Sequence, residues 1–225
     1  MAGHPAAGSG GFEAQRYDTL AMQAIPHPEA FFSSAAEYVP EGRVRVLELA
    51  SGTGIFTSFI RALRPEALVT CIDRDPAMLA IARGKPGLAG VAFIEGDIRD
   101  PWPEGPWDAV AISQCLFALT RGDQKAVLRR AYDALGEYGR FIAADFLRPE
   151  SAWEEALYRD HLHRFMLDAG MAPGDADAML DPPGRLPAWY TGATLRSLLE
   201  SAGFSRTFRP YACGFYAVIG GEKEP

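Results

Sequence analysis

Short apolar runs alternate with longer amphipathic stretches through the middle of the chain. The apolar runs are rich in β-branched residues and predict five strands, at residues 43–49, 68–72, 91–94, 108–113 and 140–146. The stretches between them have helical periodicity and predict helices at 55–64, from 75 onward and at 123–135. This alternation of strands and helices predicts an α/β fold with a parallel, doubly wound sheet.

The two ends of the chain depart from this alternation. Residues 12–40 predict two helices, separated by the turn at Pro26-His27-Pro28. Near the other end, a predicted helix at 191–202 is followed by two strand patterns at 206–213 and 215–219. We expect these last two strands to pair as a hairpin.

Residues 148–190 predict a helical insertion after the fifth strand. Ser151 and Glu154 match a capping box, which predicts a helix that runs to Gly170. The stretch 173–187 is rich in Pro, Gly and Asp and predicts a loop.

The composition is that of an ordinary globular protein, with 48% hydrophobic and 23% charged residues among 225. We predict a single domain over residues 12–225, after a disordered leader at 1–11 that is rich in Gly and Ala. The leader lacks the charged and apolar regions of a signal peptide, and no apolar run approaches the ~20 residues that a membrane helix needs. These features predict a cytoplasmic protein that does not associate with membranes.

Charge and cysteine content narrow the choice of partners. The chain has 22 Lys+Arg against 29 Asp+Glu, a net charge of −7, and an acidic protein without a basic stripe repels nucleic acid. The three cysteines form no C-x-x-C pair, so neither a zinc site nor a disulfide framework is predicted. We expect no bound metal, and the sequence leaves a homodimer open.

The most informative segment is the loop after the first predicted strand, Glu48-Leu-Ala50-Ser-Gly52-Thr-Gly54. Small residues in a tight turn between strand and helix let a ligand approach the backbone. Dinucleotide-binding loops have the pattern G-x-G-x-x-G, whereas the frame that starts at Gly52 lacks the third glycine and contains Phe56. An NAD(P)-dependent oxidoreductase is therefore the weaker interpretation of this loop.

An acidic residue followed by small residues two, four and six positions later resembles the loop of class I S-adenosylmethionine (SAM)-dependent methyltransferases. Glu48, Ala50, Gly52 and Gly54 match it, with alanine at a position where glycine is more usual. The resemblance implies a Rossmann-like, doubly wound sheet of seven strands in the order 3-2-1-4-5-7-6, with strand 7 antiparallel.

Two aspartates stand at the ends of the next two strands. Asp73 ends the second strand, where an acid can accept hydrogen bonds from both ribose hydroxyls. Asp97 follows the third strand, and in this family an acid there accepts a hydrogen bond from the adenine amino group while the next residue packs at the ring. The resemblance implies that SAM is the cofactor and that it contacts Tyr17, Glu48, Ala50, Ser51, Gly52, Thr53, Gly54, Asp73, Arg74, Met78, Gly96, Asp97, Ile98, Ser113 and Gln114.

Two residues are candidates for catalysis, and each also has an ordinary structural interpretation. Tyr17 lies in the helical lid at 12–40, where a tyrosine can close over the cationic sulfonium or anchor the helix to the core. His161 shares a stripe of spacing four with Leu157 and Phe165, which predicts that it faces inward as a general base or as a semi-buried structural histidine. His163 is predicted to face water.

Two further features bear on the acceptor: a group of aromatic residues and a cysteine after the fourth strand. Six aromatic residues of the insertion and the C-terminal part are candidates to line an acceptor pocket: Trp153, Tyr158, Phe165, Trp189, Tyr190 and Tyr211. Cys115 follows the fourth strand, and we interpret it as a small buried residue rather than a nucleophile.

The predicted activity is transfer of the methyl group of SAM to an O, N or C atom of a small-molecule acceptor, such as a secondary metabolite. The segment Arg16-Tyr17-Asp18 with Ile25-Pro26 resembles a branch that also contains carboxy-SAM synthases and enzymes of tRNA uridine modification. These activities remain alternatives, as does a SAM-binding protein without catalysis.

Overall fold

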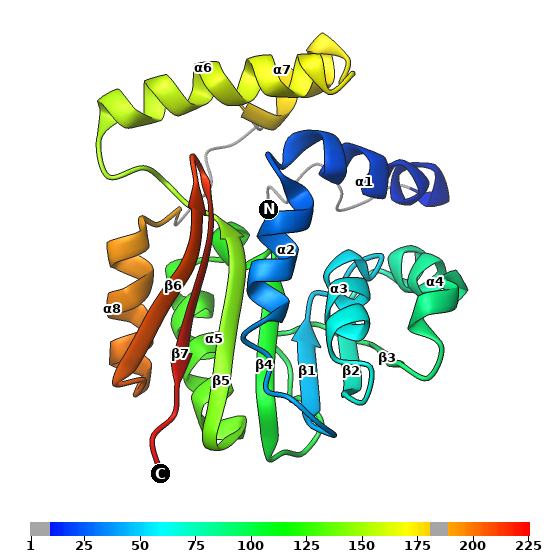
Figure 1. Cartoon of the computed structure of the whole chain (residues 1–225), viewed down its shortest axis with the longest axis vertical. Coiled ribbons are helices and arrows are strands. Elements are labelled where there is room, and N and C mark those ends of the chain that lie inside the picture. The colour runs from blue at the N-terminus through cyan, green and yellow to red at the C-terminus, as the bar shows by residue number, and fades with distance from the viewer. Residues whose placement is uncertain (1–9, 181–188) are drawn as a thin grey trace.

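Seven strands form one sheet in the order β3-β2-β1-β4-β5-β7-β6 in this computed structural model, which describes residues 10–180 and 189–225 (Figure 1). The strands are β1 (Arg45–Leu49), β2 (Leu68–Asp73), β3 (Ala92–Glu95), β4 (Trp107–Ser113), β5 (Leu135–Phe146), β6 (Arg206–Cys213) and β7 (Tyr216–Glu222). Strands β1 to β5 pair in parallel, and β7 is antiparallel to both of its neighbours. The predicted fold class and strand order are confirmed.

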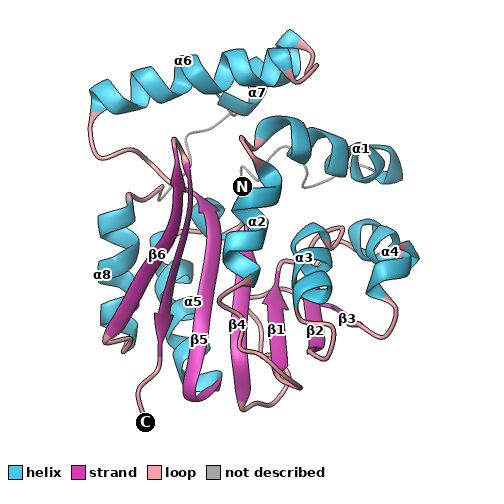
Figure 2. Ribbon diagram, in the orientation of Figure 1, coloured by secondary structure: helices cyan, strands magenta, loops and turns pink. Residues whose placement is uncertain are grey.

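Helices cover both faces of the sheet (Figure 2). They are α1 (Gly10–Ala24), α2 (Pro28–Ala36), α3 (Ile55–Leu63), α4 (Pro76–Gly84), α5 (Arg121–Ala134), α6 (Ala152–Asp168), α7 (Pro173–Leu180) and α8 (Gly192–Ala202). Successive residues of β1 point to opposite faces, so that Val46 packs in one core with residues of α2 and α3, and Leu47 packs in the other with residues of α5 and α8. Burial on both faces explains the continuous apolar runs of the central strands.

Local capping interactions fix where several helices begin. Asp75 accepts hydrogen bonds from the backbone of Ala77 (2.8 Å) and Met78 at the start of α4, with a proline in the first turn. Ser151 and Glu154 form the predicted capping box at the start of α6. These starts could be predicted because cap and capped groups lie within three residues of each other.

Some predicted boundaries were wrong. Residues 173–180 form helix α7 instead of a loop, because Pro173 occupies a helix start and Ala176 is buried against the core. The rest of that predicted loop lies outside the described residues. Gly10 and Gly11 belong to α1 rather than to a leader, and residues 1–9 are outside the described part. Strand β5 begins at Leu135 rather than at 140, because Leu135 already pairs with Trp107.

The outermost strand β6 is irregular. Its pairing with β7 shifts in register between Phe208 and Tyr211, around Pro210. Proline has no N–H to donate, so it interrupts the ladder at this point.

Candidate active site

The loop between β1 and α3 adopts the conformation that its small residues predict. Ala50, Gly52 and Gly54 all have positive φ, of 52°, 55° and 78°, a region that favours glycine. A Cβ atom added at Gly52 would meet nothing within 4 Å, whereas one at Gly54 would lie 2.6 Å from Leu88 Cδ1. The backbone at Gly52 therefore faces open space that a ligand can enter, and the backbone at Gly54 is packed against the protein.

Asp73 lies directly beside this loop. Its Oδ2 accepts a hydrogen bond from the Gly52 N–H (2.7 Å), and its Oδ1 accepts one from the Asp75 N–H (2.9 Å). The residue is buried, and burial raises the pKa of its carboxyl while the two backbone donors lower it. Each carboxylate oxygen can accept a second hydrogen bond, which leaves acceptor capacity for the two hydroxyls of a ribose.

Three buried polar atoms at or just after the carboxyl ends of β1 and β4 have no hydrogen-bond partner among the described residues: Glu48 Oε1, Ser51 Oγ and Gln114 Nε2. The other carboxyl oxygen of Glu48 accepts a hydrogen bond from Thr57 Oγ1 (2.7 Å). Gln114 follows β4, the neighbour of β1. Buried polar groups are normally satisfied, so these atoms fit a polar ligand such as the amino acid end of SAM.

Glu48 is fully buried, and its protonation follows from that. Burial raises the pKa of its carboxyl to about 8, even though the Thr57 hydroxyl stabilises the charged form. Glu48 is therefore mainly protonated at neutral pH.

The third predicted acidic contact, Asp97, is bound within its own loop. Arg99 donates to it through Nε (2.8 Å) and Nη2 (2.5 Å), and this pairing lowers the pKa of Asp97 to about 2. Ile98 is buried beside it, and the Gly96 N–H donates to the Asp73 carbonyl (2.9 Å). The loop thus lies next to Asp73, as its place after β3 predicts.

The other sequence-predicted cofactor residues lie on the same edge. Ser51 and Thr53 are buried in the loop after β1, and Ser113 is half-buried at the end of β4. Met78 is buried on α4, whereas Arg74 is exposed.

Helix α1 contributes Tyr17 and Asp18. Tyr17 is half-buried as a whole, and burial of its hydroxyl, together with the nearby Cys115, Asp73 and Asp145, raises the pKa of the phenol. Asp18 accepts a hydrogen bond from Thr53 Oγ1 and pairs with Lys85 Nζ (2.6 Å). The sequence did not predict a role for Asp18, although its place next to Tyr17 in the predicted lid was a usable indication.

A third buried acid, Asp145 near the end of β5, was also missed. Its Oδ2 accepts hydrogen bonds from the Tyr190 hydroxyl (2.6 Å) and the Phe117 N–H (3.0 Å), and its Oδ1 accepts one from the Phe146 N–H (3.0 Å). Burial raises its pKa to about 7. Burial also raises the pKa of the adjacent Cys115 thiol to about 12, so this cysteine is neutral and is not an activated nucleophile.

Three aromatic rings stack next to Asp145. The rings of Phe146 and Trp189 are nearly parallel, with an angle of 3° and centroids 5.3 Å apart, and Phe215 stacks on both. Phe146 and Trp189 are only half-buried, and Tyr158 of α6 meets Phe215 edge-on. This cluster of Phe146, Trp189 and Phe215, called the aromatic wall below, lies between β5 and the insertion.

The predicted orientation of α6 was wrong. Its buried residues are Leu162 and Met166, so His161 is exposed, and Leu157 is 38% exposed. His163 is half-buried and contacts Asp177 of α7 (3.0 Å). The stripe that packs inward is displaced by one residue from the predicted one, because contacts with other elements decide which face of α6 is buried. His161 therefore has no support as a general base, and Trp153, 72% exposed, does not line a pocket.

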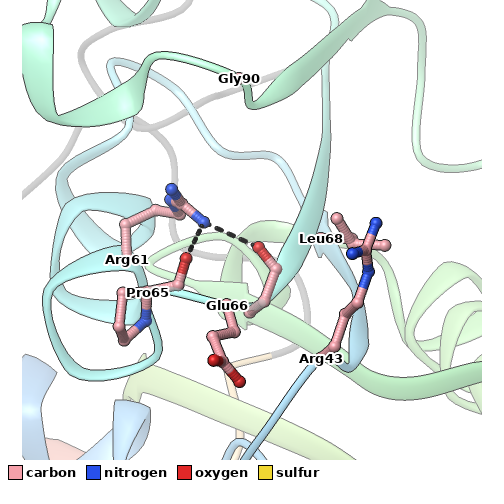
Figure 3. A pocket seen from close by; sticks show the side chains of 7 residues that line it. Arg43, Arg61, Pro65, Glu66, Leu68 and Gly90 are labelled. Carbon is pink, nitrogen blue, oxygen red and sulfur yellow. Dashed lines mark hydrogen bonds between the residues drawn. The ribbon is translucent and has the colours of Figure 1, made fainter.

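A cavity of about 420 Å³ lies at the other end of the strands, where β1, β2 and β3 begin (Figure 3). Its lining residues are Arg43, Arg61, Pro65, Glu66, Ala67, Leu68 and Gly90. Arg61 Nη1 donates to the carbonyls of Pro65 (2.7 Å) and Ala67 (2.8 Å). Ligands of doubly wound sheets bind at the carboxyl ends of the strands, so this cavity is separate from the site described above.

Known methyltransferases are similar to this chain. Residues 46–139 match the family described as methyltransferase domain. A demethylmenaquinone methyltransferase of Thermus thermophilus is 30% identical over 184 residues, which cover 80% of this chain and 82% of the relative. A ubiquinone/menaquinone biosynthesis C-methyltransferase of Methylobacterium nodulans is 30% identical over 186 residues, covering 80% of this chain and 73% of the relative.

A solved structure shows the same fold. Human N-acetylserotonin methyltransferase in complex with SAM superimposes with a TM-score of 0.65 at 19% identity, over 96% of this chain and 57% of that one. The chain therefore spans less than two thirds of that solved protein. Among the described residues, no helix has the length and apolar character needed to cross a membrane. With the loop, the acids at the strand ends, the strand order and the relatives in agreement, the chain belongs to the class I SAM-dependent methyltransferases, enzymes that use SAM as their cofactor.

Proposed function

We propose that this enzyme methylates a flat, largely apolar small molecule that carries an aromatic or quinone-like ring. The observation that carries this proposal is the aromatic wall, whose half-buried rings of Phe146 and Trp189 lie next to Asp145, an acid close enough to raise the pKa of Tyr17. Stacked aromatic rings that keep part of their surface exposed favour a flat acceptor, because aromatic groups prefer offset stacking. The names of two relatives point in the same direction, since both refer to quinones.

In this proposal, residues at different strand ends bind different parts of the cofactor. We assign the ribose to Asp73, the amino acid end to Glu48 and Gln114, and the adenine to the loop of Gly96, Asp97 and Ile98. When bound, SAM supplies a methyl group that its positively charged sulfur has already activated for transfer. The remaining task of the protein is to position the acceptor and exclude water, which accounts for a large part of the rate in such reactions.

Tyr17 is suited to orient groups between the cofactor-binding residues and the aromatic wall. Its phenol is neutral at physiological pH, and burial together with neighbouring acids of β2 and β5 raises its pKa further. A neutral phenol is a hydrogen-bond donor rather than a base. Asp145 already accepts three hydrogen bonds, so we assign it to positioning the aromatic wall and not to removing a proton from the acceptor.

The acceptor class can be tested with radiolabelled SAM and three probes: 1,4-naphthoquinol, a simple phenol and a fatty acid. We expect label to enter the ring compounds, and Trp189→Ala to raise the KM for them while the Kd for S-adenosylhomocysteine stays constant. Trp153→Ala is a matched control, because it removes an exposed tryptophan of the same insertion. Labelling of the fatty acid alone would contradict the proposal.

The alternatives from the sequence can be separated in the same preparation. Mass spectrometry of the copurifying cofactor distinguishes SAM from the heavier carboxy-SAM. The net charge of −7 favours a small acceptor over nucleic acid. A cytoplasmic location and a homodimer stay part of this proposal, to be checked by fractionation and by sedimentation.

A further inference from the structure

Two residues of α1 that flank Tyr17, Arg16 and Asp18, contact different parts of the molecule. Asp18 reaches the cofactor loop, where it accepts a hydrogen bond from Thr53 Oγ1, and it pairs with Lys85 beyond α4 (2.6 Å). Thr53 is buried and lies between the two glycines of the loop. The position of α1 is therefore tied directly to the segment that holds the cofactor.

The residue on the other side of Tyr17 contacts the insertion. Arg16 Nη2 pairs with Asp175 Oδ2 of α7 (3.1 Å), and further along α1 the side chain of Gln23 donates to the carbonyl of Ala169, just after α6 (3.0 Å). In Figure 1, α1 lies below α6 and α7 and above α3 and α4. Helix α1 is thus the element that lies between the cofactor loop and the insertion.

The insertion itself is held together independently of α1. Arg159 of α6 donates to the carbonyl of Leu180 at the end of α7 (2.6 Å), and His163 contacts Asp177 (3.0 Å). Helices α6 and α7 consequently form one unit, and α6 also reaches the aromatic wall through Tyr158. A shift of α1 would therefore move α6 and α7 together.

We propose that the segment Arg16–Asp18 couples the two halves of the active site, so that binding of the cofactor orders the insertion that covers the acceptor. Arg16 and Asp18 are positioning residues in this scheme, and Tyr17 lies between them at the centre of the site. The proposal rests on the proposed place of the acceptor beside the aromatic wall. Coupling between two binding sites is reciprocal, so we expect cofactor to raise acceptor affinity, and acceptor to raise cofactor affinity, by the same factor of about five.

Hydrogen exchange measured by mass spectrometry on the full chain, with and without S-adenosylhomocysteine, tests this coupling. We expect the ligand to slow exchange in residues 46–54, which it contacts, and also in 152–180, which it does not contact. Asp18→Asn should speed dissociation of the ligand, and both Asp18→Asn and Arg16→Ala should abolish the slowing in 152–180 while the slowing in 46–54 persists.

Matched variants separate coupling from loss of structure. Asp160→Asn breaks the exposed Asp160–Arg164 pair of α6 (2.7 Å) and should leave the ligand-dependent slowing intact. Arg16→Ala should abolish the slowing in 152–180, and exchanging the charges of the pair with Arg16→Asp and Asp175→Arg together should restore it. If Asp18→Asn does not fold, Arg16→Ala tests the coupling by itself, because it removes only the exposed pair with Asp175.

The outcomes distinguish this proposal from the proposed function. If S-adenosylhomocysteine slows exchange in 46–54 of the wild type but leaves 152–180 unchanged, the coupling is wrong while cofactor binding stands. Retention of the slowing in 152–180 in both Arg16→Ala and Asp175→Asn would also overturn it. If the ligand has no effect anywhere in the chain, cofactor binding itself fails.

Discussion

Asp73 accepts a hydrogen bond of 2.7 Å from the backbone of Gly52, although 21 positions separate the two residues in the chain. Parallel pairing of β1 and β2 brings their carboxyl ends together, so the loop after one strand and the last residue of the other meet. One carboxylate thus shapes the cofactor loop and keeps acceptor capacity for the cofactor.

Replacing this carboxylate should weaken cofactor binding strongly. Asp73→Asn keeps the size of the side chain but removes its charge, and a hydrogen bond to a charged group contributes roughly 1.5–3 kcal/mol. We expect the Kd for S-adenosylhomocysteine to rise at least about tenfold by titration calorimetry. Asp133→Asn, which removes an exposed acid of the Arg129–Asp133 pair, is the control and should leave the Kd unchanged.

Ala50 offers a test of backbone strain. Its φ of 52° is costly for a residue with a Cβ atom, by roughly 1–2 kcal/mol. Glycine removes that cost but loses more entropy on folding, so Ala50→Gly should stabilise the protein by up to about 1 kcal/mol, or about 2–4 °C in Tm. Ala126→Gly, at an exposed position inside helix α5, should destabilise it by about 1 kcal/mol. Equal effects of the two substitutions would contradict this account of Ala50.

Glu48 makes stability depend on pH. Its pKa rises from 4.5 to about 8 in the folded protein because of burial, so the folded state holds a proton that the unfolded state releases above pH 4.5. The stability that Glu48 contributes should therefore be fully present below that value and should be lost as pH rises toward about 8. Asp145, with a pKa raised to about 7, acts in the same direction.

Urea unfolding of the cofactor-free protein between pH 5 and 8.5 measures this dependence. Glu48→Gln, which carries no titratable proton, should reduce the slope to the part that Asp145 contributes, whereas Glu137→Gln on the exposed surface should not change it. A slope equal to that of the wild type in Glu48→Gln would assign the effect to other groups.

The Tyr190–Asp145 hydrogen bond should be among the more important single contacts of the insertion. Both residues are buried, and Tyr190→Phe removes one of the three donors to the carboxylate. We expect a loss of about 1.5–3 kcal/mol in the free energy of unfolding, and a further rise in the pKa of Asp145. Tyr138→Phe is a suitable control because Tyr138 is 57% exposed; its variant should unfold like the wild type.

The cofactor half of the site could be predicted because its determinants are local. The small residues from Ala50 to Gly54 specify the turn, and Asp73 and Asp97 each follow a strand that the hydrophobic pattern identifies. Parallel pairing then places these strand ends at one edge, which is why the sequence alone sufficed to bring Gly52 and Asp73 together.

The acceptor half depends on contacts between distant segments, and the sequence could not supply them. Asp145 stands inside an apolar strand, and its main partner, Tyr190, lies 45 positions away. His161 was assigned to the wrong face because α6 buries little of its own surface, so α7 and the β6–β7 hairpin determine its rotation. Helix α7 was missed for a similar reason, since Ala176 packs only in the folded protein.

The irregular edge strand has a consequence for self-association. An open sheet can extend across two copies of a chain when its outer strands offer regular rows of N–H and C=O groups. Here β6 carries Pro210 and a register shift, and the opposite edge is β3, only four residues long. Continuous sheets spanning two subunits are therefore disfavoured at both edges, and any dimer of this enzyme should form through helices or loops.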